Sequence, residues 1–259
     1  MEKSKVGIIL LAKMSSSRLP NKHALKIKGK ILLSYLLERL KKCNTVDEII
    51  LAVTQDKKDD FFIDFAKKNN IKLFRGKETL ENRNLLESFK ECAEKNNLDI
   101  IVRITGDSPF IEPEQIDRLV SEFKKSDFEY IALKTRDNKP VILSGWGLAV
   151  EVMSLETLKK AIAMNPNKVE LEHVTPFIYK NPDKFNIKFL DYPKLREFNH
   201  DDLRLTFDFP EDFEIIKEII EKLYKGEAIE LEEVIKFLKE RPHILKKMKE
   251  INNANTKKV

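Results

Sequence analysis

Short apolar runs alternate with longer segments of helical periodicity through the first half of the chain. Within the longer segments, apolar residues recur three to four positions apart, which is the spacing of one face of a helix. This alternation is typical of a βαβ sheet that is covered by helices on both faces. The predicted strands are Val6–Ala12, Glu48–Thr54, Lys72–Phe74, Asp99–Thr105 and Tyr130–Leu133. The predicted helices are Ile31–Cys43, Lys58–Asn69, Leu80–Asn96 and Glu114–Lys124.

The second half of the chain has a less regular pattern. A strand is predicted at Leu148–Met153, and a helix follows from Ser154, because a serine hydroxyl can cap the first turn of a helix. Glu170–Lys180 is predicted as one helix and Leu203–Asp208 as a strand. Pro210–Tyr224 is predicted as a helix because proline is favoured in the first helical turn. The remaining residues predict two short charged helices and a polar tail.

Composition narrows the class of protein. With 42% hydrophobic residues in a chain of 259, a sizeable core is expected, in one large α/β domain or two small ones. The net charge of +5 is spread among almost as many acidic residues, so it suits a polyphosphate and does not form a concentrated nucleic-acid stripe. Val6–Ala12 is too short to span a membrane, and Cys43 and Cys92 lack partners at metal-ligand spacing. We therefore expect a cytoplasmic protein with reduced cysteines and with neither a nucleic acid nor a membrane as partner.

The loop that follows the first predicted strand, residues 13–22, carries the strongest functional signal. Its small hydroxyl side chains let the backbone approach a phosphate, and Lys13, Arg18 and Lys22 can neutralise a triphosphate. Open α/β sheets bind their ligands at the carboxyl ends of strands, where this loop begins. The loop lacks the glycine patterns of dinucleotide and Walker A loops. A solvated serine-rich loop with unrelated cations is the alternative that composition leaves open.

Two aspartates are candidates for holding a divalent cation beside such a phosphate. Asp107 follows one predicted strand, and Asp208 ends another. Mg²⁺ prefers a few carboxylate ligands together with phosphate oxygens and water, and it stabilises the charge that develops on departing pyrophosphate. The alternatives are that Asp107 is a turn residue and that Asp208 caps the helix beginning at Pro210.

Four segments carry a family resemblance. The chain reads AKMSSSRLPNK over residues 12–22, VRITGDSP over 102–109, EHVTP over 172–176, and LRLTFD followed by PEDF over 203–213. In order and spacing these segments resemble the spore-coat-polysaccharide family of cytidylyltransferases, relatives of the CMP-sialate and CMP-KDO synthetases, whose first loop typically reads ARMGSTRLPGK. The resemblance covers about residues 6–220.

The resemblance implies a three-layer α/β/α fold, the Rossmann-like fold of nucleotide-diphospho-sugar transferases with a mostly parallel mixed sheet. It implies a nucleotidyltransferase domain at residues 1–225, with an excursion at 134–200 for acceptor binding and homodimer formation, and a C-terminal helical extension and tail at 226–259. The implied reaction uses CTP and Mg²⁺ to form a CMP-activated sugar acid of the nonulosonic type, for a surface polysaccharide. A sugar phosphate, a phosphonate or another small phosphorylated acceptor remains open, as does a non-catalytic nucleotide-binding relative.

The resemblance also assigns roles to individual residues. Those implied in catalysis are Lys22, Arg18 and Asp107. Those implied in nucleotide binding are Ala12, Lys13, Ser15, Ser16, Ser17, Arg75, Arg83 and Thr105. The implied metal ligands are Asp107 and Asp208, and the implied acceptor contacts are Glu151, Glu172 and His173.

The chain departs from the family pattern at several positions. Lys13 replaces an arginine, Ser15 a glycine, and Asn21 another glycine, although asparagine tolerates a left-handed backbone better than most residues. Ala149 stands where an aspartate is usual, which suggests an altered acceptor. The single tryptophan, Trp146, either forms a wall of the acceptor pocket or packs against the sheet.

Overall fold

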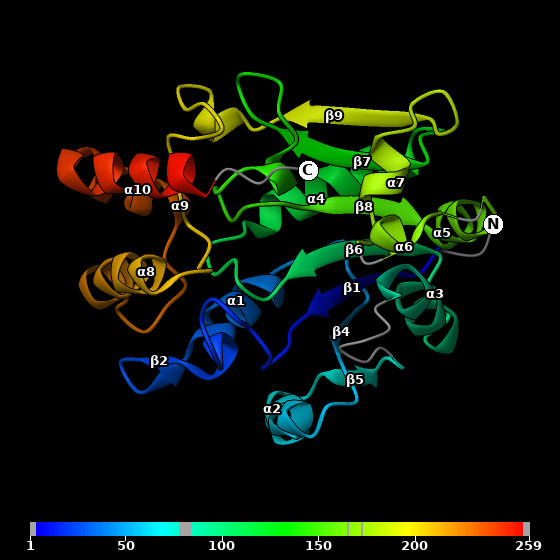
Figure 1. Ribbon diagram of the computed structural model, residues 1–259, viewed down its shortest axis with the longest axis horizontal. Helices are drawn as coiled ribbons and strands as arrows, with labels where there is room; N and C mark the ends of the chain where they lie inside the picture. Colours follow the sequence, from blue (N-terminus) through cyan, green and yellow to red (C-terminus); the bar gives the residue numbers. More distant parts are fainter. Residues whose placement is uncertain (1–3, 78–83, 165, 172, 256–259) are drawn as a thin grey trace.

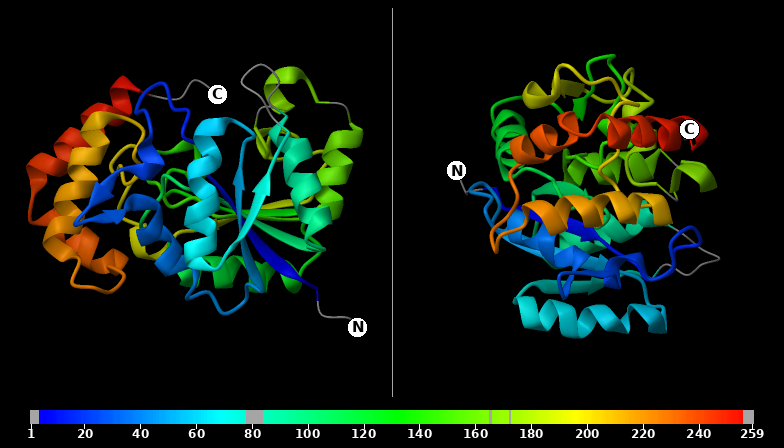
Figure 2. Two further views of the ribbon diagram at one scale, coloured as in Figure 1. Left: turned by 90° about the horizontal axis from the view of Figure 1, so that it is seen from below. Right: turned by 90° about the vertical axis from the view of Figure 1, so that its left-hand side faces the viewer.

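The computed structural model describes residues 4–77, 84–164, 166–171 and 173–255. A central seven-stranded sheet has the strand order β5-β4-β1-β6-β8-β7-β9, and helices cover both of its faces (Figures 1 and 2). None of the helices in these ranges is long and apolar enough to cross a membrane.

The elements have the following bounds. The strands are β1 (Val6–Leu11), β2 (Lys26–Ile27), β3 (Lys30–Ile31), β4 (Glu48–Val53), β5 (Lys72–Arg75), β6 (Ile100–Thr105), β7 (Tyr130–Lys134), β8 (Glu151–Ser154) and β9 (Ile187–Asp191). The helices are α1 (Leu32–Leu40), α2 (Phe61–Asn69), α3 (Leu85–Lys95), α4 (Pro113–Lys124), α5 (Leu155–Ala163), α6 (Lys168–Leu171), α7 (Pro176–Tyr179), α8 (Pro210–Leu223), α9 (Leu231–Lys239) and α10 (Pro242–Ala254). Short 3₁₀ turns lie at Lys22–Ala24, Lys57–Asp60, Val141–Leu143 and Pro193–Leu195.

The sheet is mostly parallel, with one reversed strand. β1 pairs in parallel with β4 and β6, and β4–β5 and β7–β9 are parallel pairs, whereas β8 is antiparallel to both β6 and β7. From β1 the chain first adds β4 and β5 on one side of the strand and then adds β6 on its other side. Open α/β sheets bind ligands where the strand order reverses in this way. The predicted fold class, a mostly parallel mixed sheet between helical layers, is confirmed.

Alternate side chains of β1 point to opposite faces of the sheet and join two separate hydrophobic clusters. Val6, Ile8 and Leu10 join the core under α1, α2 and α4, whereas Ile9 joins the core under α3, α5 and α7. All four side chains are fully buried. A parallel strand that is covered on both faces reads as a continuous apolar run, which explains the sequence of this segment.

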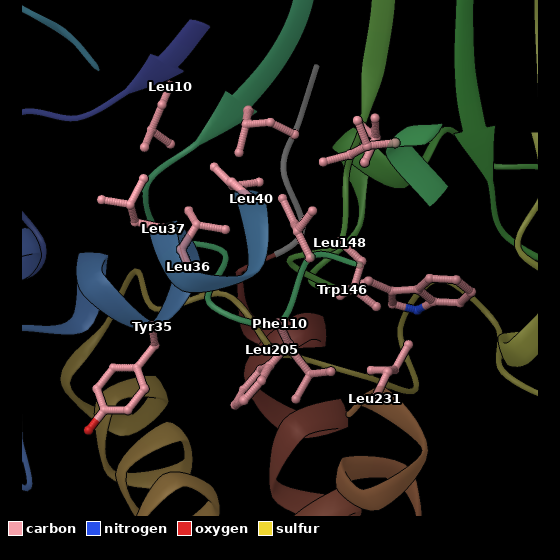
Figure 3. Close-up of a cluster of buried hydrophobic side chains, with 14 of the residues drawn as sticks. Leu10, Tyr35, Leu36, Leu37, Leu40, Phe110, Trp146, Leu148, Leu205 and Leu231 are labelled. Atoms are coloured by element: carbon pink, nitrogen blue, oxygen red, sulfur yellow. The ribbon is translucent and has the colours of Figure 1, made fainter. Parts of the chain in front are cut away.

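The three C-terminal helices, α8, α9 and α10, lie near the carboxyl ends of β1 and β6 (Figure 1). Their apolar side chains join the core of the α1 face, where Leu231 of α9 lies in one cluster with Leu37 and Trp146 (Figure 3). Trp146 is fully buried, and its Nε1 donates to the carbonyl of Asn199 at 3.0 Å. Trp146 is therefore a core residue and does not form a wall of an acceptor pocket.

Several predictions for the second half of the chain are wrong. Leu203–Asp208 is extended but is not a strand of the sheet, although its alternating apolar residues have the period of one. Glu170–Lys180 is not one helix, because Pro176 begins a separate short helix, α7, and a proline ring clashes with a preceding helical turn. The strand β9 was not predicted, whereas the strand predicted at Leu148–Met153 does form, with shifted ends, as β8.

The other predicted elements form with shifted ends. Ser154 caps α5 as predicted, since its side chain accepts from the backbone of Thr157. The predicted helix Lys58–Asn69 is a 3₁₀ turn followed by α2. Within Leu80–Asn96, the helix observed is Leu85–Lys95, and residues 80–83 lie outside the described ranges.

Gly147 lets two loops meet at the carboxyl edge of the sheet. Its φ is +62°, and a Cβ built there would lie 2.5 Å from the carbonyl carbon of Leu205 and from the amide nitrogen of Thr206. These are backbone atoms, which cannot rotate away as a side chain would. Only glycine fits both the left-handed conformation and the close approach.

We expect Gly147→Ala to destabilise the fold strongly. The left-handed backbone costs an L-residue about 1–2 kcal/mol, and overpacking against backbone adds about 1–3 kcal/mol. Gly29→Ala is the matched control, because Gly29 has φ +76° but nothing within 4 Å of a built Cβ. Urea denaturation of both variants measures the difference, and equal losses of unfolding free energy would contradict the close-approach argument.

Candidate active site

The loop between β1 and the first 3₁₀ turn is fastened to the sheet by a buried carboxylate. Asp59, which is 1% exposed, accepts the amide of Met14 at 2.7 Å through Oδ1. Its Oδ2 accepts the amide of Thr54 at 3.0 Å and the hydroxyl at 2.6 Å. Asn21 ends the loop with φ 55°, the left-handed conformation that asparagine tolerates. Asp59 therefore ties the loop to Thr54, the residue that follows β4.

Lys22 lies between the two predicted aspartates. Its Nζ is 2.6 Å from Oδ2 of Asp107 and 3.0 Å from Oδ1 of Asp208. Arg18 adds a second cation, with Nη2 at 2.9 Å from the same Asp208 oxygen. Lys22 and Asp208 are nearly buried, whereas the Arg18 side chain is 47% exposed. The acids and the cationic loop, which are distant in sequence, therefore meet at one point.

The surrounding charges keep Lys22 and Asp107 ionised. Burial lowers the pKa of Lys22, but the nearby Asp107 and Asp208 carboxylates raise it, and the net shift is upward. Burial raises the pKa of Asp107, but the charge of the Lys22 ammonium and the hydrogen bonds from Lys22 and Thr105 together lower it by more, so its pKa lies well below the usual range. Opposite charges at this distance favour the ionised form of each group.

Gly106 and the extended segment 203–209 bring the two aspartates together. The Gly106 amide donates to the carbonyl of Leu11 at 2.8 Å, and a Cβ at Gly106 would lie 2.9 Å from that oxygen. The carbonyl of Asp107 accepts the Phe207 amide at 3.2 Å and the Thr206 hydroxyl at 3.2 Å. Asp208 follows directly and is not the cap of α8, because Phe209 occupies the cap position.

These residues line one open cavity of about 830 Å³. Among the residues with predicted roles, those that line it are Ala12, Lys13, Ser15, Arg18, Lys22, Thr105, Asp107, Asp208 and His173. Ser16, Ser17, Arg75 and Glu151 do not line it, and Arg83 and Glu172 lie outside the described residues. Apolar side chains from β5 and α3 and the segment 141–149 complete the walls.

Two of the residues that do not reach the cavity brace its walls. Arg75 donates from Nε to the carbonyl of Thr54 at 3.1 Å and from Nη2 to that of Asp56 at 3.0 Å, which fixes the loop after β4. Glu151 is 1% exposed and accepts hydrogen bonds from Arg103 and Tyr130. Arg103, for which the sequence predicts no role, also lines the cavity. Asp59 is a second residue without a predicted role, because its lysine- and aspartate-rich surroundings are typical of a solvated surface.

The family model for cytidylyltransferases matches residues 7–251. The chain belongs to the cytidylyltransferase family. It is thus a nucleotidyltransferase, and the predicted family is confirmed.

Individual cytidylyltransferases and relatives agree with this membership. The chain is 35% identical over 239 residues to an uncharacterized protein of Methanocaldococcus jannaschii, covering 92% of each chain. It is 28% identical over 244 residues to the spore coat polysaccharide biosynthesis protein SpsF of Bacillus subtilis, covering 90% of this chain and 94% of that protein. It is 31% identical over 136 residues to a 3-deoxy-manno-octulosonate cytidylyltransferase of Geotalea daltonii, covering about half of each. A solved cytidylyltransferase structure from Leptospira borgpetersenii is similar with a TM-score of 0.80 and 31% identity, covering 94% of this chain and 97% of that one.

The donor atoms of this cytidylyltransferase fit a divalent cation that is shared with a ligand. In the described ranges, no group of three or more His, Cys, Asp or Glu side chains could hold a metal ion by itself. Asp107 and Asp208, however, both contact Lys22 Nζ, so their oxygens lie around one cationic position. Mg²⁺ commonly takes one or two carboxylates and completes its shell with phosphate oxygens and water.

His23 lies under the site as a neutral ring. It is 3% exposed, its Nδ1 is 2.7 Å from the carbonyl of Lys13, and its Nε2 has no hydrogen-bond partner within the described residues. The contact with a carbonyl oxygen requires the proton on Nδ1. Burial and the neighbouring Lys22 ammonium lower its pKa from 6.5 to about 4.

We expect His23 to make the free energy of unfolding fall as the pH becomes acidic. Because the unfolded chain takes up this proton near pH 6.5 and the folded chain only near pH 4, the His23 contribution is complete above pH 6.5 and falls as the pH drops toward 4. The full loss is about 3 kcal/mol. Urea denaturation between pH 4 and 7 should give a flatter profile for His23→Gln than for the wild type. His243→Gln, at an exposed position on α10, is the control, and a profile for His23→Gln as steep as that control would refute the assignment.

Proposed function

We propose that this cytidylyltransferase transfers the CMP group of CTP to a sugar acid of the nonulosonic type and releases pyrophosphate, in the synthesis of a surface polysaccharide. The observation that carries the proposal is that the cationic loop and the two aspartates line one cavity. The names of two relatives support the acceptor class, since one refers to spore coat polysaccharide biosynthesis and the other to 3-deoxy-manno-octulosonate.

The size and walls of the cavity suit two substrates. Small-molecule sites usually have volumes of roughly 300–1,000 Å³, and about 830 Å³ is near the upper end of that range. The cations lie at the end formed by the loop after β1, and apolar residues of β5 and α3 line another wall. We assign the first region to the triphosphate and the second to the base and ribose. The segment 141–149 and His173 are assigned to the acceptor.

The loop after β1 would bind the phosphates. Lys13, Arg18 and Lys22 supply positive charge, and Ser15 supplies a hydroxyl on the cavity wall. Ser16 and Ser17 do not line the cavity, so their part in the proposal is limited to the backbone of the loop. Charge-assisted hydrogen bonds from such groups are about twice as strong as neutral ones.

Asp107 and Asp208 would hold Mg²⁺ beside the α-phosphate. The geometry supports this role, because oxygens of both carboxylates lie around the one position that the Lys22 ammonium contacts. Mg²⁺ bound there would stabilise the negative charge that builds on the phosphates. Lys22, which contacts both acids, would add a point charge next to the departing pyrophosphate.

The reaction is a substitution at phosphorus. The acceptor hydroxyl oxygen forms a bond to the α-phosphorus, and the bond from that phosphorus to the oxygen that bridges to the β-phosphorus breaks. Pyrophosphate carries away the electron pair, and the acceptor proton passes to solvent. Holding both substrates in one cavity makes the step effectively unimolecular, which is the main contribution that positioning residues make.

We expect Asp107→Asn to lower turnover by at least about 10²-fold, because it removes one anionic ligand from a site that depends on metal charge. The assay is pyrophosphate release from CTP and Mg²⁺ with 3-deoxy-manno-octulosonate and related sugar acids. Lys22 keeps Asp208 as a partner, so the melting temperature should change little.

Asp64→Asn, at an exposed position on α2, is the control for the chemical change. Wild-type turnover in Asp107→Asn would remove Asp107 from the mechanism. Pyrophosphate release that occurs only with sugar phosphates or phosphonates would replace the proposed acceptor class.

A further inference from the structure

Arg103 is a cation in the cavity that stands apart from the loop after β1. It lies on β6, two residues before Thr105, so both side chains project from the same face of the sheet. Both residues line the cavity. The other cationic lysine and arginine residues of its lining, Lys13, Arg18 and Lys22, all belong to the loop.

A buried pair of side chains holds the Arg103 guanidinium. Glu151 is its cross-strand neighbour on β8 and accepts a hydrogen bond from its Nη1. The other Glu151 oxygen accepts the hydroxyl of the fully buried Tyr130 on β7. Three adjacent strands thus fix the orientation of one guanidinium, and a fixed guanidinium loses less entropy when it binds a ligand.

The Arg103 guanidinium has donors left over. A guanidinium carries five N–H groups, and Glu151 accepts from Nη1 alone; Nε is buried, whereas Nη2 is neither among the buried atoms nor hydrogen-bonded within the described ranges, so its donors are the ones left for a ligand. The Arg103 side chain is 11% exposed and lines the cavity, as does Ala149, whose side chain is only a methyl group. A cation that is only partly satisfied beside an uncharged wall is suited to a carboxylate ligand.

We propose that Arg103 binds the carboxylate of the acceptor and that Glu151 and Tyr130 position it. This inference rests on the proposed function and refines it, because it makes the acceptor's negative charge the recognised feature. Glu151 then acts through Arg103 and does not touch the acceptor itself. Arg103 would contact the acceptor and not the nucleotide, whose phosphates are assigned to the loop.

The test compares Arg103→Lys and the double variant Arg103→Met/Glu151→Gln with the wild type. Removing the Arg103 charge alone would leave the buried Glu151 carboxylate without a counter-charge, which can prevent folding. The double variant avoids this because it removes both charges. The probes are 3-deoxy-manno-octulosonate and its methyl ester, titrated calorimetrically into enzyme saturated with a non-hydrolysable CTP analogue and Mg²⁺. Steady-state KM values for CTP and for the acid are measured in parallel.

We expect the double variant to bind the acid about 10- to 100-fold more weakly, the effect of losing a hydrogen bond to a charged group. Binding of the ester should differ little between the wild type and the double variant, and KM for CTP should stay unchanged. Arg103→Lys should fall between, since an ammonium cannot make the two-pronged contact.

Three outcomes overturn the inference: equal weakening for acid and ester, a rise in KM for CTP alone, or a wild type that binds no sugar acid. A wild type that binds the acid but releases no pyrophosphate refutes the proposed function instead. In that case the acid and ester affinities still decide the role of Arg103.

A separate network connects the C-terminal helix to Asp208. Asp212, in the first turn of α8, accepts the amides of Asp208 at 2.8 Å and Phe209 at 2.9 Å. It also accepts Arg204 through both oxygens, at 2.6 and 2.9 Å. Arg204 in turn donates from Nη1 to Oδ1 of Asn252 on α10 at 3.0 Å.

Asn252 closes this network against the backbone. Its Nδ2 donates to the carbonyls of Asp201 at 2.8 Å and Leu203 at 2.9 Å, which are the start of the segment that carries Asp208. Arg204, Asp212 and Asn252 are all at least nine-tenths buried. The position of the Asp208 backbone is thus set by side chains that do not reach the cavity.

We infer that Asn252 is a positioning residue for Asp208, and that α10 is part of the support of the metal site. The inference rests on Asp208 as a metal ligand. Partners behind a metal ligand typically change metal affinity 10- to 100-fold when they are substituted.

Asn252→Asp is the informative variant. It preserves side-chain size but turns an oxygen toward the carbonyls of Asp201 and Leu203. Asn253→Asp, at an exposed position on the same helix, makes the same chemical change and is the control. Mn²⁺ affinity of the CTP complex is measured by electron paramagnetic resonance, together with CTP affinity in EDTA and the melting temperature.

We expect at least about 10-fold weaker Mn²⁺ binding for Asn252→Asp, with CTP affinity in EDTA unchanged and Asn253→Asp like the wild type. Loss of melting temperature with wild-type Mn²⁺ affinity would show a purely structural role and overturn the inference. Asp208→Asn is measured alongside, because a wild-type Mn²⁺ affinity in that variant would refute the metal assignment itself.

Discussion

A single ammonium group between two carboxylates is the interaction on which the site is built. Asp107 and Asp208 arrive from different parts of the chain, and without a cation between them their charges would repel in a poorly solvated position. Lys22 contacts both at 2.6 and 3.0 Å. Because Lys22 ends the loop after β1, the contact that places a positive charge between the two acids also holds this loop beside them.

Buried carboxylates also hold the backbone around this contact. Asp59 accepts the amide of Met14 in the loop after β1, and Asp212 accepts the amide of Asp208. Neither side chain reaches the cavity. Each accepts backbone amides that would otherwise be unpaired in the interior, so these irregular segments are fixed by hydrogen bonds although they belong to no strand or helix. Such rigidity is what electrostatic stabilisation of a transition state requires.

The sequence was sufficient for the parts of the site that follow local rules. A loop after the first strand, and an aspartate after a glycine at the end of another, could be recognised from order and spacing. The segment 203–208 shows where this fails. Leu203, Leu205 and Phe207 alternate as in a strand and are fully buried, yet the segment joins no sheet. Whether an extended segment finds a strand partner depends on the rest of the fold, which its own residues do not encode.

The same limit applies to buried polar residues. Glu151 was assigned to the acceptor, but its oxygens are taken by Arg103 and Tyr130 from neighbouring strands. Asp59 was overlooked because its neighbours are exposed lysines and aspartates. In both cases the role follows from strand register and loop packing, which appear only once distant segments are paired.

The reversed direction of β8 has a consequence for how this enzyme family can diversify. β7 ends and β8 begins at the same edge of the sheet, so the residues between them, 135–150, leave and re-enter at fixed points beside the cavity. A change of sequence or length between those two anchors can therefore reshape this wall of the cavity while the strand order and the loop after β1 stay as they are.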